Sequence, residues 1–270
     1  MKNYKILFRS SGWKEEEEEK KIASKHFDVI SQRTEAKPGD IIIGRYSVLP
    51  FYKELENDLQ NQESQLINSF HQHQYIADIK NWYEDLEQET FKTWFRAEDI
   101  PLDEPGPFVL KGQTNSRKFL WKTHMFAKDK EELSKVFERL LDDSLIGTQE
   151  IYFRKYEKLK KFDLEEINGI PISNEWRFFV AENQIISKGF YWSSHLEDIK
   201  ESGQKIEEPD ETLVKRIIEK VGNNASFYVV DVAQKEDNSW MMVELNDGQM
   251  SGLSDNSPET LYSGLRKVLK

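Results

Sequence analysis

The sequence predicts an α+β protein in which a small α/β domain precedes a larger domain rich in strands. Three observations predict this arrangement. Strand-like and helical segments alternate in the N-terminal part, a proline-rich stretch follows, and the apolar runs after it are mostly of strand length. The chain has 270 residues, which is enough for two modest domains or one large one.

The small domain is predicted over residues 1–105. A glutamate run at 15–19 fits a solvated helix face with Glu–Lys pairs four residues apart. Pro38-Gly39 introduces a buried strand that ends next to Arg45. The expected elements are strands at 4–9 and 40–44 and helices at 13–27, 52–68 and 71–88.

The predicted domain boundary lies in the segment 100–107, which holds three prolines and a glycine. Such a segment continues neither a helix nor a central strand. The second domain is therefore predicted over 106–270, and Asp129 with Glu132 predicts a capped helix start within it. The expected strands are 108–111, 120–127, 149–156, 175–181, 184–192, 226–233 and 239–246, and the later helices are 210–221 and 258–269.

Composition excludes several classes of function. The chain has 49 acidic and 38 basic residues, a formal charge of −11, which disfavours broad binding of nucleic acid or membrane surfaces. It has no cysteine, which excludes disulfides, thiolate nucleophiles and cysteine-ligated metals. No run is long and apolar enough for a membrane span or a signal peptide, so we expect a cytoplasmic protein.

The most informative segment is a predicted hairpin, 227–233 and 240–246, that carries carboxylates inside apolar strands. A two-residue turn at Asp237-Asn238 places Asp231 directly opposite Glu244. Asn246 shares a face with Glu244 by the two-residue period of a strand. Two opposed carboxylates repel each other, and oxygen ligands favour Mg²⁺. The sequence therefore predicts a magnesium site here; the alternative is an exposed sheet face with ordinary polar residues.

Three cations are candidates for phosphate binding. Lys111 ends an apolar strand, and a loop of small and polar residues follows it, with Lys118 placed to close over outer phosphates. The loop is not a Walker motif, and a lysine at a strand end is often merely solvated. Arg177 lies in an apolar strand and needs an anionic partner, which is either Glu175 on the same face or a phosphate.

Taken together, these motifs resemble the ATP-grasp superfamily. Val109-Leu110-Lys111-Gly112 is similar to its phosphate-lysine strand, and Glu244-Leu245-Asn246 is similar to its terminal Glu-x-Asn. The whole chain further resembles a compact ATP-grasp group of bacteria and phages. The segments that carry this second resemblance are 45–52, 75–78, 81–86 and 169–175.

The resemblance implies an ATP-grasp fold in which two α+β lobes, 106–160 and 161–270, clasp ATP behind a pre-ATP-grasp domain. Its implied cofactors are ATP and Mg²⁺, with Asp231, Glu244 and Asn246 as metal ligands. Lys111 and Arg177 take catalytic roles. The residues implied to bind ATP are Lys80, Lys111, Lys118, Arg154, Lys155, Tyr156, Arg177 and Lys188. Lys155 and Tyr156 would face adenine from a hinge strand, and Arg45 is a candidate for holding the acid substrate.

The expected activity is ligation of a carboxylate, activated as an acyl phosphate, to an amine or a thiol. The substrates are expected to be small molecules, peptides or proteins. A kinase on the same site and a non-catalytic nucleotide-binding or interaction module are alternatives. Metal-dependent nucleic-acid chemistry is a further alternative that the acidic balance disfavours. Trp192 is a candidate wall of the pocket.

Overall fold

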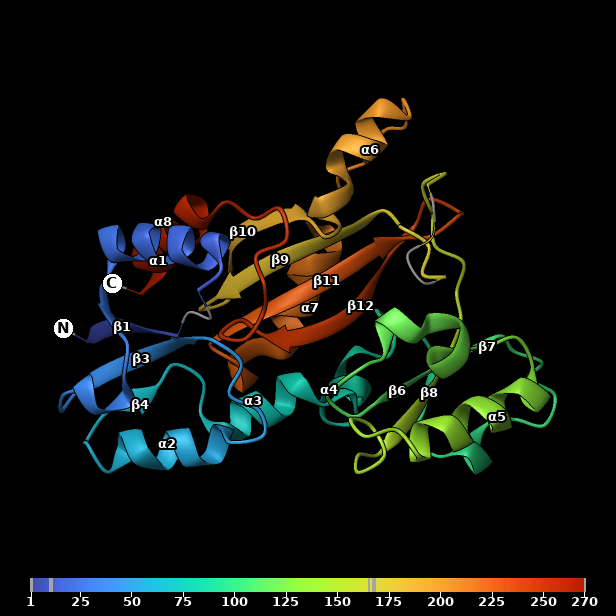
Figure 1. The fold of residues 1–270 in the computed structure, drawn as a ribbon, viewed down its shortest axis with the longest axis horizontal. Coiled ribbons are helices and arrows are strands. Elements are labelled where there is room, and N and C mark those ends of the chain that lie inside the picture. Colours follow the sequence, from blue (N-terminus) through green and yellow to red (C-terminus); the bar gives the residue numbers. More distant parts are fainter. Residues whose placement is uncertain (1, 10–11, 165, 167–168, 270) are drawn as a thin grey trace.

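A computed structural model describes residues 2–9, 12–164, 166 and 169–269 of the chain. Its strands form three four-stranded sheets, and helices pack on them (Figure 1). The strands are β1 (Asn3–Phe8), β2 (Asp28–Ile30), β3 (Asp40–Arg45), β4 (Gln65–Leu66), β5 (Thr93–Trp94), β6 (Phe108–Gly112), β7 (Phe126–Ala127), β8 (Ile151–Lys155), β9 (Glu175–Ala181), β10 (Gln184–Phe190), β11 (Phe227–Gln234) and β12 (Trp240–Asp247). The α-helices are α1 (Lys14–His26), α2 (Tyr52–Gln60), α3 (Phe70–Ala77), α4 (Ile79–Leu86), α5 (Lys130–Leu141), α6 (Leu196–Glu201), α7 (Thr212–Val221) and α8 (Pro258–Val268).

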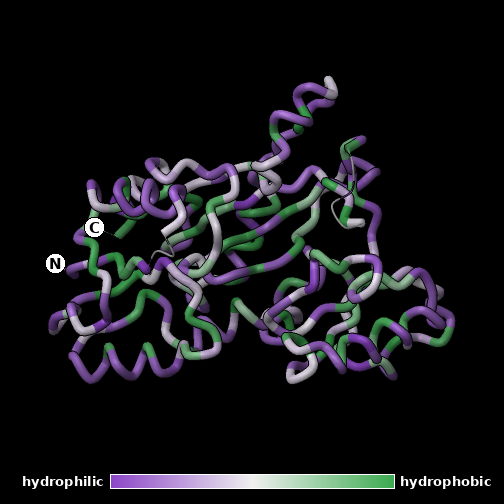
Figure 2. The backbone as a smooth tube through the Cα atoms, viewed as in Figure 1, coloured by the Kyte–Doolittle hydropathy of each residue, from purple (hydrophilic) through white to green (hydrophobic). Residues whose placement is uncertain are grey.

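The N-terminal sheet has the strand order β2-β1-β3-β4, and its strands run parallel. Ile42 and Ile43, in the middle of the predicted strand, are fully buried. α2 alternates between hydrophilic and hydrophobic residues and packs its leucines toward the sheet (Figure 2). Because β2 and β3 lie on opposite sides of β1, the strand order reverses between β1 and β3.

The central sheet, β10-β9-β11-β12, is antiparallel and covered on both faces. Val230 packs with α3, α4 and α7 on one face, and Val229 packs with α1 and α8 on the other, since successive strand residues point to opposite faces. Burial on both faces explains the nearly continuous apolar run of β11 in the sequence.

The third sheet, β5-β8-β6-β7, is antiparallel and is covered by α5. The side chain of Asp129 caps α5 by accepting a hydrogen bond from the Glu132 N–H at 2.9 Å, as predicted. β5 lies before the proline-rich segment, yet it pairs with β8 on the far side of that segment. The third sheet therefore draws one strand from sequence upstream of the boundary predicted near residue 105.

The structure corrects three predicted elements. The helix predicted at 52–68 ends at Gln60, because Glu63 has a φ of +56° that a helix does not allow, and β4 follows it. The strand predicted at 120–127 is mostly a π-helical turn (Trp121–Met125), and only its last two residues pair with β6. The helix predicted at 71–88 is two helices, because Asp78 leaves helical geometry and caps α4, accepting a hydrogen bond from the Lys80 N–H at 3.0 Å. Short strands β2, β4 and β5 and the projecting helix α6 (Figure 1) were not predicted.

Candidate active site

A cavity of about 810 Å³, here called the cleft, lies between the third sheet and the central sheet. β6 and β8 form one wall, and β9 and β12 contribute to the other. Trp192, the predicted pocket wall, also lines it. The predicted site residues that line the cleft are Lys111, Lys118, Arg154, Lys155, Tyr156 and Glu244.

The pleat of β6 aims Lys111 into the cleft. Phe108 and Leu110 are fully buried in the core beneath α5. Because side chains alternate along a strand, Val109 and Lys111 point the other way and line the cleft. An apolar strand that ends in lysine thus delivers its ammonium group to the space between the two sheets.

Arg154 comes from the neighbouring strand and ties the two walls together. It pairs in register with Val109, and its guanidinium donates to the Val243 carbonyl at 2.9 Å and to the Thr90 hydroxyl at 2.8 Å. Burial lowers the pKa of Arg154 to about 10, so it stays charged at neutral pH. Its Nε is buried and has no partner among the described residues, which leaves one donor available at the cleft wall.

Arg177, Asp231 and Glu244 form a row across three strands of the central sheet. Asp231 pairs in register with Arg177 on β9 and with Glu244 on β12. Directly paired residues share a face, so the three side chains lie on one side of the sheet. The predicted pairing of Asp231 with Glu244, and that of Val229 with Asn246, is confirmed.

The hairpin reaches this register by a different route from the predicted one. Lys235 pairs with Ser239, with its N–H donating to the Ser239 carbonyl at 2.8 Å, so the loop has three residues instead of two. By itself, the longer loop would shift every predicted β11–β12 residue pair by one residue. A bulge at Val243 adds one residue to β12 and restores the opposition of Asp231 and Glu244.

The partner of Arg177 is Asp231 rather than Glu175. Its Nε and Nη2 donate to the two carboxylate oxygens of Asp231 at 2.9 and 2.8 Å. Its Nη1 donates to the Gly252 carbonyl at 2.8 Å, and its guanidinium lies 4.9 Å from the ring centre of Tyr191. Burial opposes the charge of Arg177, but Asp231 outweighs it and holds the arginine pKa above its usual value.

Glu244 is the partner of both lysines. Lys111 Nζ lies 3.0 Å from one of its carboxylate oxygens, and Lys118 Nζ lies 3.8 Å from the other. Lys118 also donates to the Tyr191 hydroxyl at 2.8 Å. Burial would raise the pKa of Glu244, but the two ammonium groups and a hydrogen bond with Asn246 hold it well below its usual range. Glu244 is therefore an anion held between the ammonium groups of Lys111 and Lys118.

The donor set of Asp231, Glu244 and Asn246 fits a hard divalent cation. Among the described residues, no three His, Asp or Glu side chains form a metal cluster. All three offer oxygen, the donor that Mg²⁺ prefers. A cation placed at this row would take over the charge balance that Arg177 and Lys111 supply to the carboxylates.

Aromatic side chains form the hinge end of the cleft. Phe126 stacks on Trp121 with ring centres 6.1 Å apart and meets the edge of Tyr156 at 5.2 Å. The N–H groups of Lys155 and Tyr156 donate to the backbone carbonyls of Lys92 and Pro107 at 2.8 and 2.9 Å. A base in this cleft would therefore meet the carbonyls of these residues, or the backbone that follows them, and not their N–H groups.

Sequence reasoning missed the chemistry of Glu175. It lines the cleft and accepts a short hydrogen bond from the Ser173 hydroxyl. Burial raises the pKa of Glu175 to about 7, although the nearby Lys118 acts against this. The available signal was its position two residues before Arg177, which puts both on one face. Its carboxyl group can gain or lose a proton near neutral pH.

Two predicted lysines lie outside the cleft. Lys80 is half-exposed and pairs with Glu150 at 2.9 Å. Lys188 lies on the opposite face of the sheet from Arg177, in register with Phe178, and pairs with Glu208 at 2.6 Å. A one-residue bulge in β10, between the pairs of Ile185 and Ser187, causes this, because without it Lys188 would sit directly opposite Arg177.

Arg45 is fully engaged within the protein. Its Nε and Nη2 contact Glu19 at 2.9 and 2.8 Å, and its Nη1 donates to the carbonyls of Gly248 and Ser251 at 2.6 and 3.0 Å. It is 8% exposed. Arg45 therefore joins the end of β3 to the segment after β12, and these contacts occupy the nitrogens that it would offer to a substrate carboxylate.

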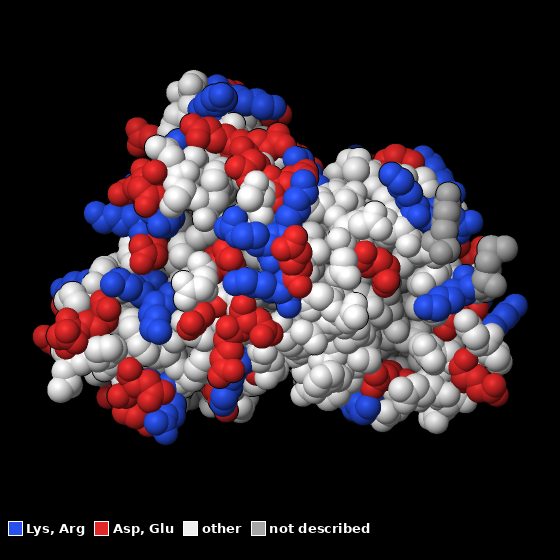
Figure 3. Space-filling model, turned by 180° about the vertical axis from the view of Figure 1, so that it is seen from behind, with Lys and Arg blue, Asp and Glu red and all other residues white. Residues whose placement is uncertain are grey.

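The outer surface carries charges of both signs. On the face drawn in Figure 3, basic and acidic side chains lie interspersed, and no continuous basic stripe crosses the described part of that face. None of the helices in the described residues is both long enough and apolar enough to cross a bilayer.

Comparison with known proteins places these features in one family. The model of the ATP-grasp domain, R2K clade family 3, matches residues 100–265. No curated protein matches the sequence.

Solved structures share the fold at low sequence identity. The chain is similar to the RimK domain protein ATP-grasp from Sphaerobacter thermophilus, with a TM-score of 0.56, 14% identity, and 97% of this chain and 98% of that chain covered. It is similar to D-cycloserine synthetase DcsG, with a TM-score of 0.61, 11% identity and coverage of 99% and 100%. It is also similar to the ATP-grasp ligase PsnB complexed with minimal precursor, Mg and ADP, with a TM-score of 0.58, 9% identity and coverage of 100% and 99%. The chain, with its strand lysine, its arginine strand and its terminal Glu-x-Asn, therefore belongs to the ATP-grasp family.

Proposed function

We propose that the chain is an Mg-ATP-dependent ligase that converts a carboxylate into an acyl phosphate for attack by an amine or, less often, a thiol. The family supports ATP as the nucleotide, and several structural neighbours are named ligases or synthetases. Their identity to this chain is too low to carry a substrate across. The proposal therefore depends on the residues of the cleft.

The single observation that carries the proposal is the cluster of opposite charges at and beside the cleft wall. Lys111 and Lys118 contact Glu244, and the Arg177–Asp231 pair lies beside them in the same row. A site for Mg-ATP needs cations for the phosphate oxygens and carboxylates for the divalent ion. These two kinds of group must lie next to each other, because the ion binds the phosphates. In the absence of ligand, the cations and the carboxylates neutralise each other's charge.

We assign the residues of the site to three parts of the ligand: adenine, the phosphates and Mg²⁺. The aromatic side chains of Trp121, Phe126 and Tyr156 offer a surface for adenine, and the phosphates would extend toward Lys111 and Arg177. On binding, phosphate oxygens replace Glu244 as partners of the lysines. Asp231, Glu244 and Asn246 would hold Mg²⁺, which when bound offsets phosphate charge.

The chemistry then needs positioning and charge rather than a protein nucleophile. A carboxylate oxygen of the acid attacks the γ-phosphorus, and the bond to the leaving ADP oxygen breaks. The acceptor nitrogen or sulfur next attacks the acyl carbon, loses its proton, and expels phosphate. Lys111 and Arg177 stabilise the charge on the phosphoryl group in flight. We propose small molecules or peptides as substrates; one structure of the neighbour PsnB holds a precursor peptide.

Calorimetry with a non-hydrolysable ATP analogue, with and without Mg²⁺, tests nucleotide binding. Lys111→Met should weaken the analogue by at least about tenfold, because a charge-assisted contact is lost. Lys188→Met is the matched control and should leave affinity unchanged, because Lys188 lies in the central sheet on the face opposite to Arg177.

Product analysis then separates the alternatives. A ligase forms ADP and free phosphate only when acid and acceptor are both present. A phosphorylated product without free phosphate would identify a kinase. Binding without turnover over a panel of acids would identify a nucleotide-binding module.

A further inference from the structure

A second cavity, of about 890 Å³, opens at the carboxyl ends of β1 and β3. We call it the N-terminal pocket. Phe8 and Arg9 reach it from the end of β1, and Arg45 and Tyr46 from the end of β3. The strand order of the parallel sheet reverses between these two strands. Such a reversal is where open α/β sheets bind their ligands, because the loops on either side diverge and leave a crevice.

The pocket adjoins the row formed by Arg177, Asp231 and Glu244. Part of its lining is the segment 249–252, which follows the Glu-x-Asn strand directly. Gly252 lines the pocket, and its carbonyl accepts the hydrogen bond from Arg177 Nη1 at 2.8 Å. The other two contacting nitrogens of Arg177 hold Asp231. A molecule in the N-terminal pocket would therefore have one end close to the arginine that faces the proposed phosphoryl transfer.

Three arginines line this pocket, and they differ in what they already bind. Arg45 is used by Glu19 and by backbone carbonyls, and Arg33 is paired with Asp58. Arg9 makes no ion pair with any described residue; its guanidinium lies over the ring of Tyr46, 5.0 Å from the ring centre. Arg9 is thus the cation of the pocket with capacity for a new anion.

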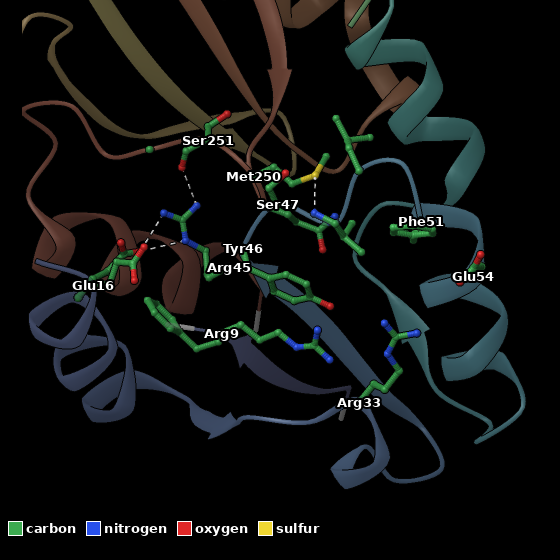
Figure 4. A pocket seen from close by; sticks show the side chains of 16 residues that line it. Arg9, Glu16, Arg33, Arg45, Tyr46, Ser47, Phe51, Glu54, Met250 and Ser251 are labelled. Carbon is green, nitrogen blue, oxygen red and sulfur yellow. Dashed lines mark hydrogen bonds and ion pairs between the residues drawn. The ribbon is translucent and has the colours of Figure 1, made fainter. Parts of the chain in front are cut away.

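Tyr46 adds a second donor beside Arg9 (Figure 4). Its hydroxyl is buried and makes no hydrogen bond of good geometry with a described residue, although the Arg33 guanidinium lies close to it. Burial raises the pKa of Tyr46 although the nearby Arg9 and Arg33 act against this, so the phenol keeps its proton and can donate. A buried hydroxyl without a partner is costly, and an acceptor atom from a ligand would relieve that cost.

The opposite wall of the pocket is apolar. Phe51 is 55% exposed and Leu49 is 37% exposed, and both line the pocket together with Met250 (Figure 4). Large apolar side chains that are exposed to solvent to this extent offer a contact surface for an apolar group. Glu54 lies next to Phe51 at the same rim and also lines the pocket, so an amine is the competing ligand type.

We propose that the N-terminal pocket binds a co-substrate that carries a carboxylate and an apolar body. Arg9 and the Tyr46 hydroxyl hold the carboxylate, and Phe51 and Met250 contact the apolar body. The opposite end of the molecule faces Gly252 and Arg177, so the carboxylate at Arg9 anchors the substrate and is not the group that reacts. This proposal rests on the proposed ligase function and names the substrate class of that site.

Saturation-transfer NMR with three probes that share one apolar body tests the proposal. The probes are 3-phenylpropionate, 3-phenylpropionamide and 3-phenylpropylamine. We expect the carboxylate to bind best. Arg9→Gln should weaken it by about tenfold and Tyr46→Phe by about threefold, while the amide changes little, because only the carboxylate uses a charge-assisted contact. Arg96→Gln removes an exposed charge outside both cavities and is the matched control.

Two results would overturn the proposal: tighter binding of the amine than of the carboxylate, or equal affinity of the carboxylate for wild type and Arg9→Gln. Binding of the ATP analogue, measured on the same samples, separates this outcome from failure of the proposed function. If the ligase function is wrong, either the analogue does not bind wild type, or it binds and the product analysis described above shows no ligation. If only this pocket is misassigned, the analogue binds wild type and Arg9→Gln alike.

Discussion

Replacing Glu244 with glutamine should change the affinity for ATP in opposite directions with and without Mg²⁺. Glu244 has two roles in the proposed site: it neutralises Lys111 and Lys118 in the empty cleft, and it offers oxygen to the metal. Glu244→Gln removes the charge and keeps the size. It therefore frees both ammonium groups for phosphate and at the same time weakens the metal site.

The distances set the scale of both effects. The two ammonium nitrogens lie 3.0 and 3.8 Å from the carboxylate, where one pair of unit charges is worth about 4 kcal/mol at an effective dielectric constant of about 20. The side chain of Lys118 is 34% exposed, so solvent reduces this value considerably. We expect metal-free ATP to bind about tenfold tighter to the variant, or about 1.4 kcal/mol. With Mg²⁺ we expect at least about tenfold weaker binding, because even outer-shell partners of metals cost that much when lost.

Isothermal titration calorimetry with the ATP analogue, in excess EDTA and in excess Mg²⁺, measures both affinities. Glu236→Gln is the matched control, because Glu236 lines the same cleft, is exposed and makes no ion pair with a described lysine. Its two affinities should change by less than about threefold, in the same direction. Equal affinities of wild type and Glu244→Gln in both buffers would refute a shared role for Glu244 in charge balance and metal binding.

Three further predictions concern single side chains. Arg177→Met leaves Asp231 buried without its partner and should lower the free energy of unfolding by about 3 kcal/mol or more in urea titrations; a loss below about 1 kcal/mol would contradict the importance of the pair. Lys80→Met should leave the affinity for the ATP analogue within about twofold in calorimetry, because Lys80 pairs with Glu150 outside the cleft; a tenfold loss would restore it as an ATP ligand. Glu175→Gln should gain stability relative to wild type as the pH rises. The pKa of Glu175 in the folded state, about 7, exceeds its ordinary value of 4.5, so the folded wild type holds an extra proton between these values and loses stability as pH increases through them. The difference in unfolding free energy should grow by about 3 kcal/mol between pH 4 and 8, and a difference independent of pH would show that Glu175 titrates normally.

Local patterns in the sequence were sufficient for most strands and for one half of the site. β11 and β12 are adjacent in the chain, so their turn and their two-residue period place Asp231 opposite Glu244. Even there, two departures cancelled: the loop was one residue longer than predicted, and the bulge at Val243 compensated. Strand pairing predicted from the two-residue period stays correct only when an extra loop residue is offset by a bulge of one residue.

Pairings between distant segments could not be read in the same way. β9 lies between β10 and β11, and only that order gives Arg177 the partner Asp231 instead of its sequence neighbour Glu175. The bulge in β10 has no compensating change, so it moves Lys188 to the far face of the sheet. No residue type in the segment 184–188 predicts a bulge. A bulge nevertheless moves the side chains beyond it to the opposite face of the sheet.

Arg45 shows a different limit. Its place at the carboxyl end of a parallel strand was predicted, and that end does border a cavity. The sequence could not show that Glu19 and the carbonyls after β12 would use up its hydrogen-bonding capacity. Nothing in the sequence suggested a role for the neighbouring Arg9. It is the arginine of this pocket that makes no ion pair with a described residue.

A crystal structure with the non-hydrolysable ATP analogue and Mn²⁺ in place of Mg²⁺ tests the proposed metal site most directly. Anomalous scattering locates Mn²⁺ without reference to the surrounding protein. We predict a peak in coordination range of side-chain oxygens of Glu244 and Asn246, next to Asp231, with Lys111 moved from Glu244 to a phosphate oxygen. A peak elsewhere in the cleft, or a nucleotide bound while the Lys111–Glu244 contact stays intact, would contradict it.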